Sequence, residues 1–292
     1  MKHGIFVAYW NKRESSQYYI DKIARLGFDS VELGSNALLN LNTKEELADL
    51  KAYAADKGVG ITIGAGLSRD SSLSSPDPAV RERGKAIMTE LMEKMNLADV
   101  RVAGGAGVPT YWPMDYSQPV DKVGDRGRSI ESMRELAKVA EDNGVLLCAE
   151  VVNRFESHIL NTAEEALAYV KEIGSPKVKI LLDTFHMNIE EDSIPAAIRL
   201  AGDYLGHLHT GESNRKLPGS GHLPWREICE AVVDIGYDDG IVMEPFVIST
   251  EHSYRGIRLF RDLSGNADEA KLDRDAAESL IFFRHVLKQC QK

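Results

Sequence analysis

The sequence predicts an α/β protein that folds as one closed (β/α)8 barrel over residues 1–292. Short apolar segments alternate with longer amphipathic segments, and this alternation repeats eight times along a chain of 292 residues. Strands that alternate with helices favour a parallel sheet with right-handed crossover connections. Eight such units in a chain of this length fit a closed barrel better than an open doubly wound sheet. No linker rich in Pro, Gly or Ser divides the sequence, so we expect a single domain.

The predicted strands are short runs of apolar residues, and several end in glycine or in a polar side chain. In chain order they cover residues 4–9, 30–33, 61–63, 100–103, 145–150, 178–183, 205–209 and 240–244. The first strand is not followed by the Gly-x-Gly-x-x-Gly sequence of dinucleotide-binding proteins, which argues against a Rossmann fold.

The predicted helices lie between those strands and carry their apolar residues at helical spacing. They cover residues 18–26, 43–58, 78–97, 129–143, 162–173, 194–201, 224–235 and 273–289. Two of them begin with a capping box, in which Thr43 pairs with Glu46 and Thr162 pairs with Glu165.

The composition indicates a globular protein that binds neither nucleic acid nor a membrane. Hydrophobic residues make up 43% of the chain, enough for a large core, and the formal net charge is −10. An acidic surface disfavours contact with nucleic acid. No apolar stretch approaches the roughly 20 residues that a membrane-spanning helix needs. The three scattered cysteines are typical of reduced thiols, and the N-terminus lacks a signal-peptide pattern, so we expect a cytoplasmic protein.

Four polar residues stand at the ends of four consecutive apolar strands, and they are Glu150, Asp183, His209 and Glu244. The carboxyl ends of the strands converge on one rim of a (β/α)8 barrel, where active sites lie. Three carboxylates gathered there would repel one another unless a divalent cation lay between them. One imidazole with three carboxylates suits Mn²⁺, Co²⁺ or Mg²⁺, whereas Zn²⁺ would more often bring a second His or a Cys.

Each of these residues has an ordinary explanation when it is taken alone. A Glu at a strand end is usually a solvated residue of the rim, and a single His is more often structural. Four such residues on successive strands are harder to explain as coincidence. Further polar side chains crowd the loops beyond the strands, and there we predict substrate contacts for Glu156, His186 and Arg215. For Arg154 and Asn188, a hydrogen bond that stabilises the loop is an equally good explanation.

Several stretches of this sequence resemble the D-tagatose/D-allulose (D-psicose) 3-epimerase family of xylose isomerase-like barrels. The resemblance extends over nearly the whole chain with the family's spacing, and the matching stretches are residues 2–5, 111–113, 150–156, 182–191, 206–215 and 243–246. It implies a Mn²⁺, Co²⁺ or Mg²⁺ site formed by Glu150, Asp183, His209 and Glu244. It also implies that Glu150 and Glu244 are the catalytic acid and base, and that the protein is a homodimer or homotetramer.

The resemblance further implies a free ketose as the substrate, with C3 as the carbon that is epimerised. It implies contacts to the O1–O3 end of the sugar from Glu156, His186 and Arg215, and a position beside the sugar for Trp112 and Phe6. Phe6 stands where the family typically has Tyr, and Glu14 stands where Trp is common. The segment 248–254 replaces a glycine-rich one. These departures leave D-allulose/D-fructose, D-tagatose/D-sorbose and L-ribulose/L-xylulose open as substrate pairs.

Other functions fit parts of the same pattern. An aldose–ketose isomerase on this barrel would use similar residues but move a proton between C1 and C2. A phosphoketose epimerase would need a phosphate-binding loop, and we find no clear one. An abasic-site endonuclease would need more metal ligands and a basic groove, which the net charge of −10 argues against. A non-catalytic sugar-binding protein would not need two acid–base carboxylates around a metal.

Overall fold

Eight parallel strands close into a barrel in the computed structural model, which describes residues 1–117 and 119–291. Each strand pairs with the next one along the chain, and β8 pairs with β1 to close the ring. The strands are β1 (Lys2–Phe6), β2 (Ser30–Gly34), β3 (Gly60–Gly64), β4 (Val102–Gly105), β5 (Leu146–Val151), β6 (Val178–Asp183), β7 (Leu205–Thr210) and β8 (Gly240–Met243). The predicted (β/α)8 barrel is therefore confirmed.

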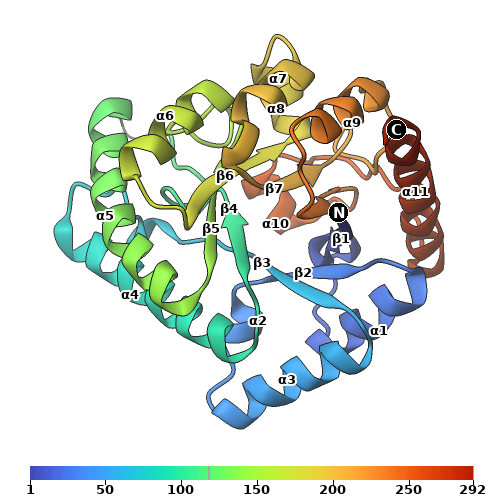
Figure 1. Ribbon diagram of the computed structural model, residues 1–292, viewed down its shortest axis with the longest axis horizontal. Coiled ribbons are helices and arrows are strands. Elements are labelled where there is room, and N and C mark those ends of the chain that lie inside the picture. Colours follow the sequence, from blue (N-terminus) through green and yellow to red (C-terminus); the bar gives the residue numbers. More distant parts are fainter. Residues whose placement is uncertain (118, 292) are drawn as a thin grey trace.

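Most of the helices surround the barrel, and Figure 1 shows these as an outer ring with the strands at the centre. The helices are α1 (Ser16–Leu26), α2 (Asn36–Leu39), α3 (Lys44–Asp56), α4 (Pro78–Leu97), α5 (Lys122–Asn143), α6 (Ala163–Ile173), α7 (Thr184–Glu190), α8 (Ile194–Ala201), α9 (Trp225–Asp234), α10 (Glu251–Gly256) and α11 (Glu269–Cys290). Among the described residues, none of these helices is long and apolar enough to cross a membrane.

The first strand is shorter than the sequence predicted. It ends at Phe6, and a turn of 3-10 helix over Val7–Trp10 follows. Trp10 is buried there and donates from Nε1 to Asp273 of α11 at 2.8 Å. The prediction of a strand through Tyr9 was wrong because these apolar residues pack under the last helix instead of continuing the sheet.

One capping prediction needs correction, and three helices were missed. The box of Thr43 and Glu46 is confirmed, but the second box is only half formed: Thr162 accepts from the Glu165 backbone, whereas the Glu165 carboxylate accepts from Asn161 N–H at 2.8 Å. Three short helices, α2, α7 and α10, were not predicted. The helix α7 begins directly at the end of β6, because the side chain of Asp183 caps it by accepting from Phe185 N–H.

Candidate active site

The four predicted metal ligands converge at the carboxyl ends of consecutive strands. Glu150 lies on β5, Asp183 ends β6, His209 lies on β7, and Glu244 directly follows β8. Each residue offers one ligand atom, and these atoms lie within 4.8 Å of one another. His209 Nδ1 is 3.5 Å from a Glu150 oxygen and 3.6 Å from a Glu244 oxygen. We call these four residues the ligand cluster.

Burial and mutual repulsion perturb the carboxylates of the ligand cluster. Burial, assisted by the nearby Glu244 charge, raises the pKa of Glu150 to about 7. Burial likewise raises the pKa of Asp183 to about 6, against the opposing charge of Arg215. Burial also acts to raise the pKa of Glu244, but the positive charges of His209 and Arg215 outweigh it and lower that pKa. The site therefore holds negative charge that protein groups only partly neutralise.

Two atoms of the ligand cluster show that its residues suit a divalent cation. Glu150 Oε1 and His209 Nδ1 are buried, face one another, and have no hydrogen-bond partner. Buried polar groups normally find partners, so two unpartnered atoms in one site favour an ion between them. Three carboxylates and an imidazole are a donor set for a divalent metal.

Arg215 links the ligand cluster to the loops above it. Its guanidinium donates to Asp183 at 3.2 Å and to Glu244 at 3.1 Å. It also lies between two aromatic rings, 4.2 Å from the centre of Phe185 and 4.9 Å from that of Phe246. The backbone of Arg215 has a φ of 64°, a left-handed conformation that costs energy for a residue other than glycine. This cost is tolerated where the side chain must reach into the site.

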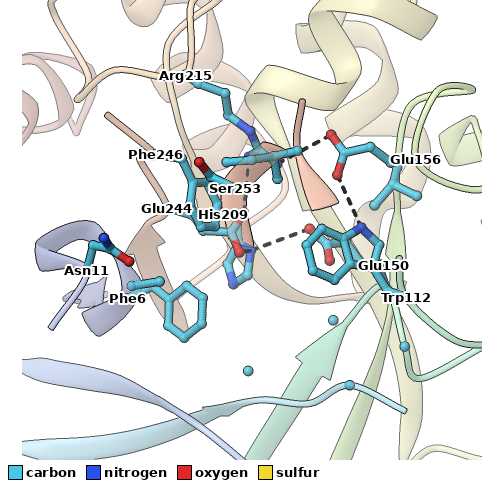
Figure 2. A pocket seen from close by; sticks show the side chains of 18 of the residues that line it. Phe6, Asn11, Trp112, Glu150, Glu156, His209, Arg215, Glu244, Phe246 and Ser253 are labelled. Carbon is cyan, nitrogen blue, oxygen red and sulfur yellow. Dashed lines mark hydrogen bonds and ion pairs between the residues drawn. The ribbon is translucent and has the colours of Figure 1, made fainter. Parts of the chain in front are cut away.

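A second group of polar side chains faces the same cavity from the β4, β5 and β6 loops. The Glu156 carboxylate accepts from Trp112 Nε1 at 3.3 Å (Figure 2). It also accepts from Asn153 Nδ2 at 3.1 Å. The backbone N–H of Asn153 donates to His186 Nδ1 at 3.2 Å. Burial and the nearby Arg215 charge lower the pKa of His186 well below its usual value. His186 is therefore neutral.

Aromatic side chains line the same cavity. Its volume is about 370 Å³, within the usual range for small-molecule sites. Phe6 from β1 and Trp112 line it, together with Phe246 after β8 (Figure 2). The Phe6 ring lies edge-on to Phe246, with ring centres 6.4 Å apart, and packs against Gly64, where an added Cβ would come within 3.2 Å of it. A polar end and an apolar wall therefore share one cavity.

Comparison with known proteins identifies the family. A family model described as a xylose isomerase-like TIM barrel matches residues 20–269. The chain belongs to this family. Among its relatives in the family is the D-psicose 3-epimerase of Ruminiclostridium cellulolyticum, 50% identical over 100% of this chain and 99% of the relative. Another is the D-psicose 3-epimerase of Agrobacterium fabrum, 49% identical over 98% of this chain and 99% of the relative.

A solved structure agrees with this assignment. The crystal structure of a D-psicose 3-epimerase in the presence of D-fructose has a TM-score of 0.95 and 48% identity, and it covers 98% of this chain and 99% of that chain. The predicted resemblance to the 3-epimerase family is therefore confirmed. The predicted enzyme class, an isomerase of the carbohydrate epimerase type, is confirmed with it.

The sequence predicted nine site residues, and all of them lie in the wall of this cavity or directly beside it. They are Phe6, Trp112, Glu150, Glu156, Asp183, His186, His209, Arg215 and Glu244. Of the two residues left between alternatives, Arg154 forms an ion pair with Glu190 at 2.8 Å and has a largely exposed side chain. The loop-stabilising explanation therefore holds for Arg154.

Two residues that position the site were not singled out from the sequence. Asn153 contacts both Glu156 and His186, and its place in a polar loop just after Glu150 was the available signal. Glu212 is fully buried and accepts from the Trp225 indole at 2.6 Å and from the backbone N–H groups of Gly219 and Leu223. It organises the loop that carries Arg215, and a lone Glu in a polar loop gave no sign of burial.

Metal binding to the ligand cluster is expected to weaken as pH falls from about 8 to about 5.5. Because the metal-free pKa values are about 7 for Glu150 and about 6 for Asp183, both groups take up protons over this range, and an ion must displace them. Titration calorimetry with Mn²⁺, repeated in buffers of different ionisation enthalpy, measures both the affinity and the protons released. Equal affinity across the range, with no proton release, would contradict the expectation.

Proposed function

We propose that the chain is a metal-dependent ketose 3-epimerase, which inverts the configuration at C3 of a free ketose. One observation carries the proposal: the carboxylates of Glu150 and Glu244 come from different strands, and both approach His209 Nδ1, at 3.5 and 3.6 Å. Two buried carboxylates in one site are what a two-sided proton exchange requires. The 3-epimerase activity in the names of relatives at 50% and 49% identity supports the same reaction.

Inversion at C3 needs one group that removes a proton and another that returns a proton to the opposite face. In our proposal Glu150 and Glu244 take these two roles and exchange them in the reverse reaction. A divalent cation in the ligand cluster, Mn²⁺ or Co²⁺ by preference and Mg²⁺ as the alternative, would supply positive charge that polarises the ketose carbonyl and stabilises the enediolate.

The polar side of the cavity suits the O1–O3 end of a ketose. Nε2 of the neutral His186 ring lies 4.0 Å from the Glu150 carboxylate. The guanidinium of Arg215 approaches the same ring nitrogen at 3.2 Å. Both groups offer hydrogen bonds or positive charge where negative charge develops on the sugar oxygens. Glu156, held by Trp112 and Asn153, accepts from a sugar hydroxyl in this arrangement.

Phe6, in the wall of the cavity, affects which ketose is preferred. Phe6 has no hydroxyl to donate, so this part of the wall selects by shape and contact area. The relatives include enzymes named for D-psicose and for L-ribulose, the latter 37% identical over 69% of this chain. We propose the D-allulose (D-psicose)/D-fructose pair as the first substrate to test, with D-tagatose/D-sorbose and L-ribulose/L-xylulose as the others.

The experiment that tests the proposal is a panel of free ketoses incubated with Mn²⁺- or Co²⁺-loaded protein in deuterated water. Products are separated by chromatography, and NMR locates the deuterium. We expect a C3 epimer labelled at C3, and a loss of rate of about 10²-fold or more after chelation, reversed by added metal. Label at C1 or C2 would instead indicate an aldose–ketose isomerase. Undiminished activity after complete chelation would refute the metal requirement.

A further inference from the structure

A buried polar group lies beneath the ligand cluster, inside the barrel. Glu32 of β2 is 1% exposed and meets His207 and His209 of β7, although β2 and β7 do not pair in the sheet. The three side chains therefore touch across the barrel interior. Thr62 of the neighbouring β3 donates its hydroxyl to the same carboxylate at 2.9 Å.

The two oxygens of Glu32 face different side chains. Oε2 accepts from Thr62 and lies 2.9 Å from His207 Nε2. Oε1 lies 2.9 Å from His209 Nε2. The imidazole of His209 thus has a carboxylate on each side, with Nε2 toward Glu32 and Nδ1 toward Glu150 and Glu244.

This arrangement decides which nitrogen of His209 can bind a metal. Nε2 is 2.9 Å from Glu32, whereas Nδ1 is 3.5 and 3.6 Å from Glu150 and Glu244. A carboxylate only accepts hydrogen bonds, so the proton that the ring keeps when a metal is bound belongs on Nε2, beside Glu32. The lone pair of Nδ1 then points into the ligand cluster. We propose that Glu32 is a positioning residue that holds His209 in the tautomer and orientation needed to bind the metal, an inference that rests on the proposed function. Histidine ligands in metalloproteins commonly donate their other nitrogen to such a carboxylate.

The energetic cost of burying these three polar side chains supports a functional role for them. A carboxylate and two imidazoles inside a barrel core must be desolvated, and apolar side chains of similar size would fill that space without this cost. Glu32, His207 and His209 could in principle form a second metal site, since their ligand atoms lie close together. That site would share His209 with the ligand cluster. Two ions held at once would require the imidazolate form of His209, which has no proton on either nitrogen. A supporting role toward one ion needs no such species.

The decisive experiment compares Mn²⁺ binding to Glu32→Gln, Thr62→Val and the unaltered protein by titration calorimetry, without substrate. Glu32→Gln keeps the side-chain volume but removes the charge beside His209, and we expect its affinity to fall about 10- to 100-fold. Thr62→Val is the matched control, because it removes a partner of the other oxygen only. We expect it to lose no more than about 5-fold. Circular dichroism and thermal unfolding of the metal-free proteins check the fold.

Spectroscopy separates positioning from a purely structural role. We expect the d–d absorption spectrum of the Co²⁺-loaded protein to change in Glu32→Gln and to stay as it is in Thr62→Val. In Mg²⁺-loaded protein, ¹⁵N NMR of the imidazoles should show the one ring proton of His209 on Nε2. Should Glu32→Gln fail to fold, Glu32→Asp keeps the charge but withdraws it from His209, and weaker metal binding is again expected.

Three results would overturn the proposal. They are an unchanged affinity and Co²⁺ spectrum in a folded Glu32→Gln variant, a His209 proton on Nδ1 in the Mg²⁺-loaded protein, and two bound ions per chain of which one is lost in His207→Gln. If the unaltered protein binds no Mn²⁺ or Co²⁺, the proposed metal-dependent function fails instead. The two failures are therefore distinguishable in the same titration.

Discussion

Glu150→Gln and Glu244→Gln are each expected to lower the rate of C3 epimerisation by about 10²- to 10⁴-fold, the usual contribution of a positioned acid or base. Both side chains are buried beside His209, and an amide of the same shape can neither take nor return a proton. The rate is measured by chromatography of the ketose epimers. Because both residues are also predicted ligands, calorimetry must establish how much metal each variant retains.

Deuterium exchange gives a sharper test than the loss of rate. With one carboxylate removed, the other should still exchange the C3 hydrogen of the epimer whose hydrogen faces it. Glu150→Gln should therefore exchange the C3 hydrogen of one epimer with solvent, and Glu244→Gln that of the other epimer. Neither variant should form the inverted product. Asp183→Asn is the control, since it alters the ligand cluster without touching the proposed acid and base, and its residual exchange should treat both epimers alike. Exchange of the same epimer by both glutamine variants would contradict the two-sided mechanism.

Arg215→Met is expected to destabilise the metal-free protein by about 3–5 kcal/mol and to reduce turnover strongly. The guanidinium is the positive partner of Asp183 and Glu244, and removing it leaves buried carboxylates without compensation. Unfolding by urea, followed by circular dichroism, measures the loss. We expect the loss to be smaller with saturating Mn²⁺, because the ion supplies positive charge to the same carboxylates and binds only the folded state.

Arg154→Met is the matched control for this experiment. It removes an arginine from a neighbouring loop that is also paired with a glutamate, Glu190, but its side chain is largely exposed to water. The Glu190 side chain is buried but borders water on the Arg154 side, so the loss of stability should be smaller than for Arg215→Met. Turnover should stay near that of the unaltered protein. An Arg215→Met variant no less stable than Arg154→Met would show that Arg215 does not compensate the buried carboxylates.

The barrel and the ligand cluster could be predicted from short-range patterns. Strand and helix periodicities are local, and a polar residue that ends an apolar strand marks the same rim in every unit of a barrel. Glu150, Asp183, His209 and Glu244 all stood at such positions, so closing the ring was enough to bring them together. The same reasoning failed for Val7–Trp10, because an apolar run does not say whether it packs within the sheet or beneath a distant helix.

Contacts across the barrel and the shape of the loops were decided only in the tertiary structure. No local pattern connects Glu32 to His209, which is far along the chain and on an unpaired strand, yet closure of the ring places their atoms 2.9 Å apart. The left-handed backbone of Arg215 and its position between Phe185 and Phe246 likewise depend on a loop held by buried Glu212. The sequence by itself therefore determined the fold and the residues that converge at its rim, since both follow from local periodicity. Their tautomers, pKa values and supporting contacts depend on burial and on neighbours that only the closed barrel supplies.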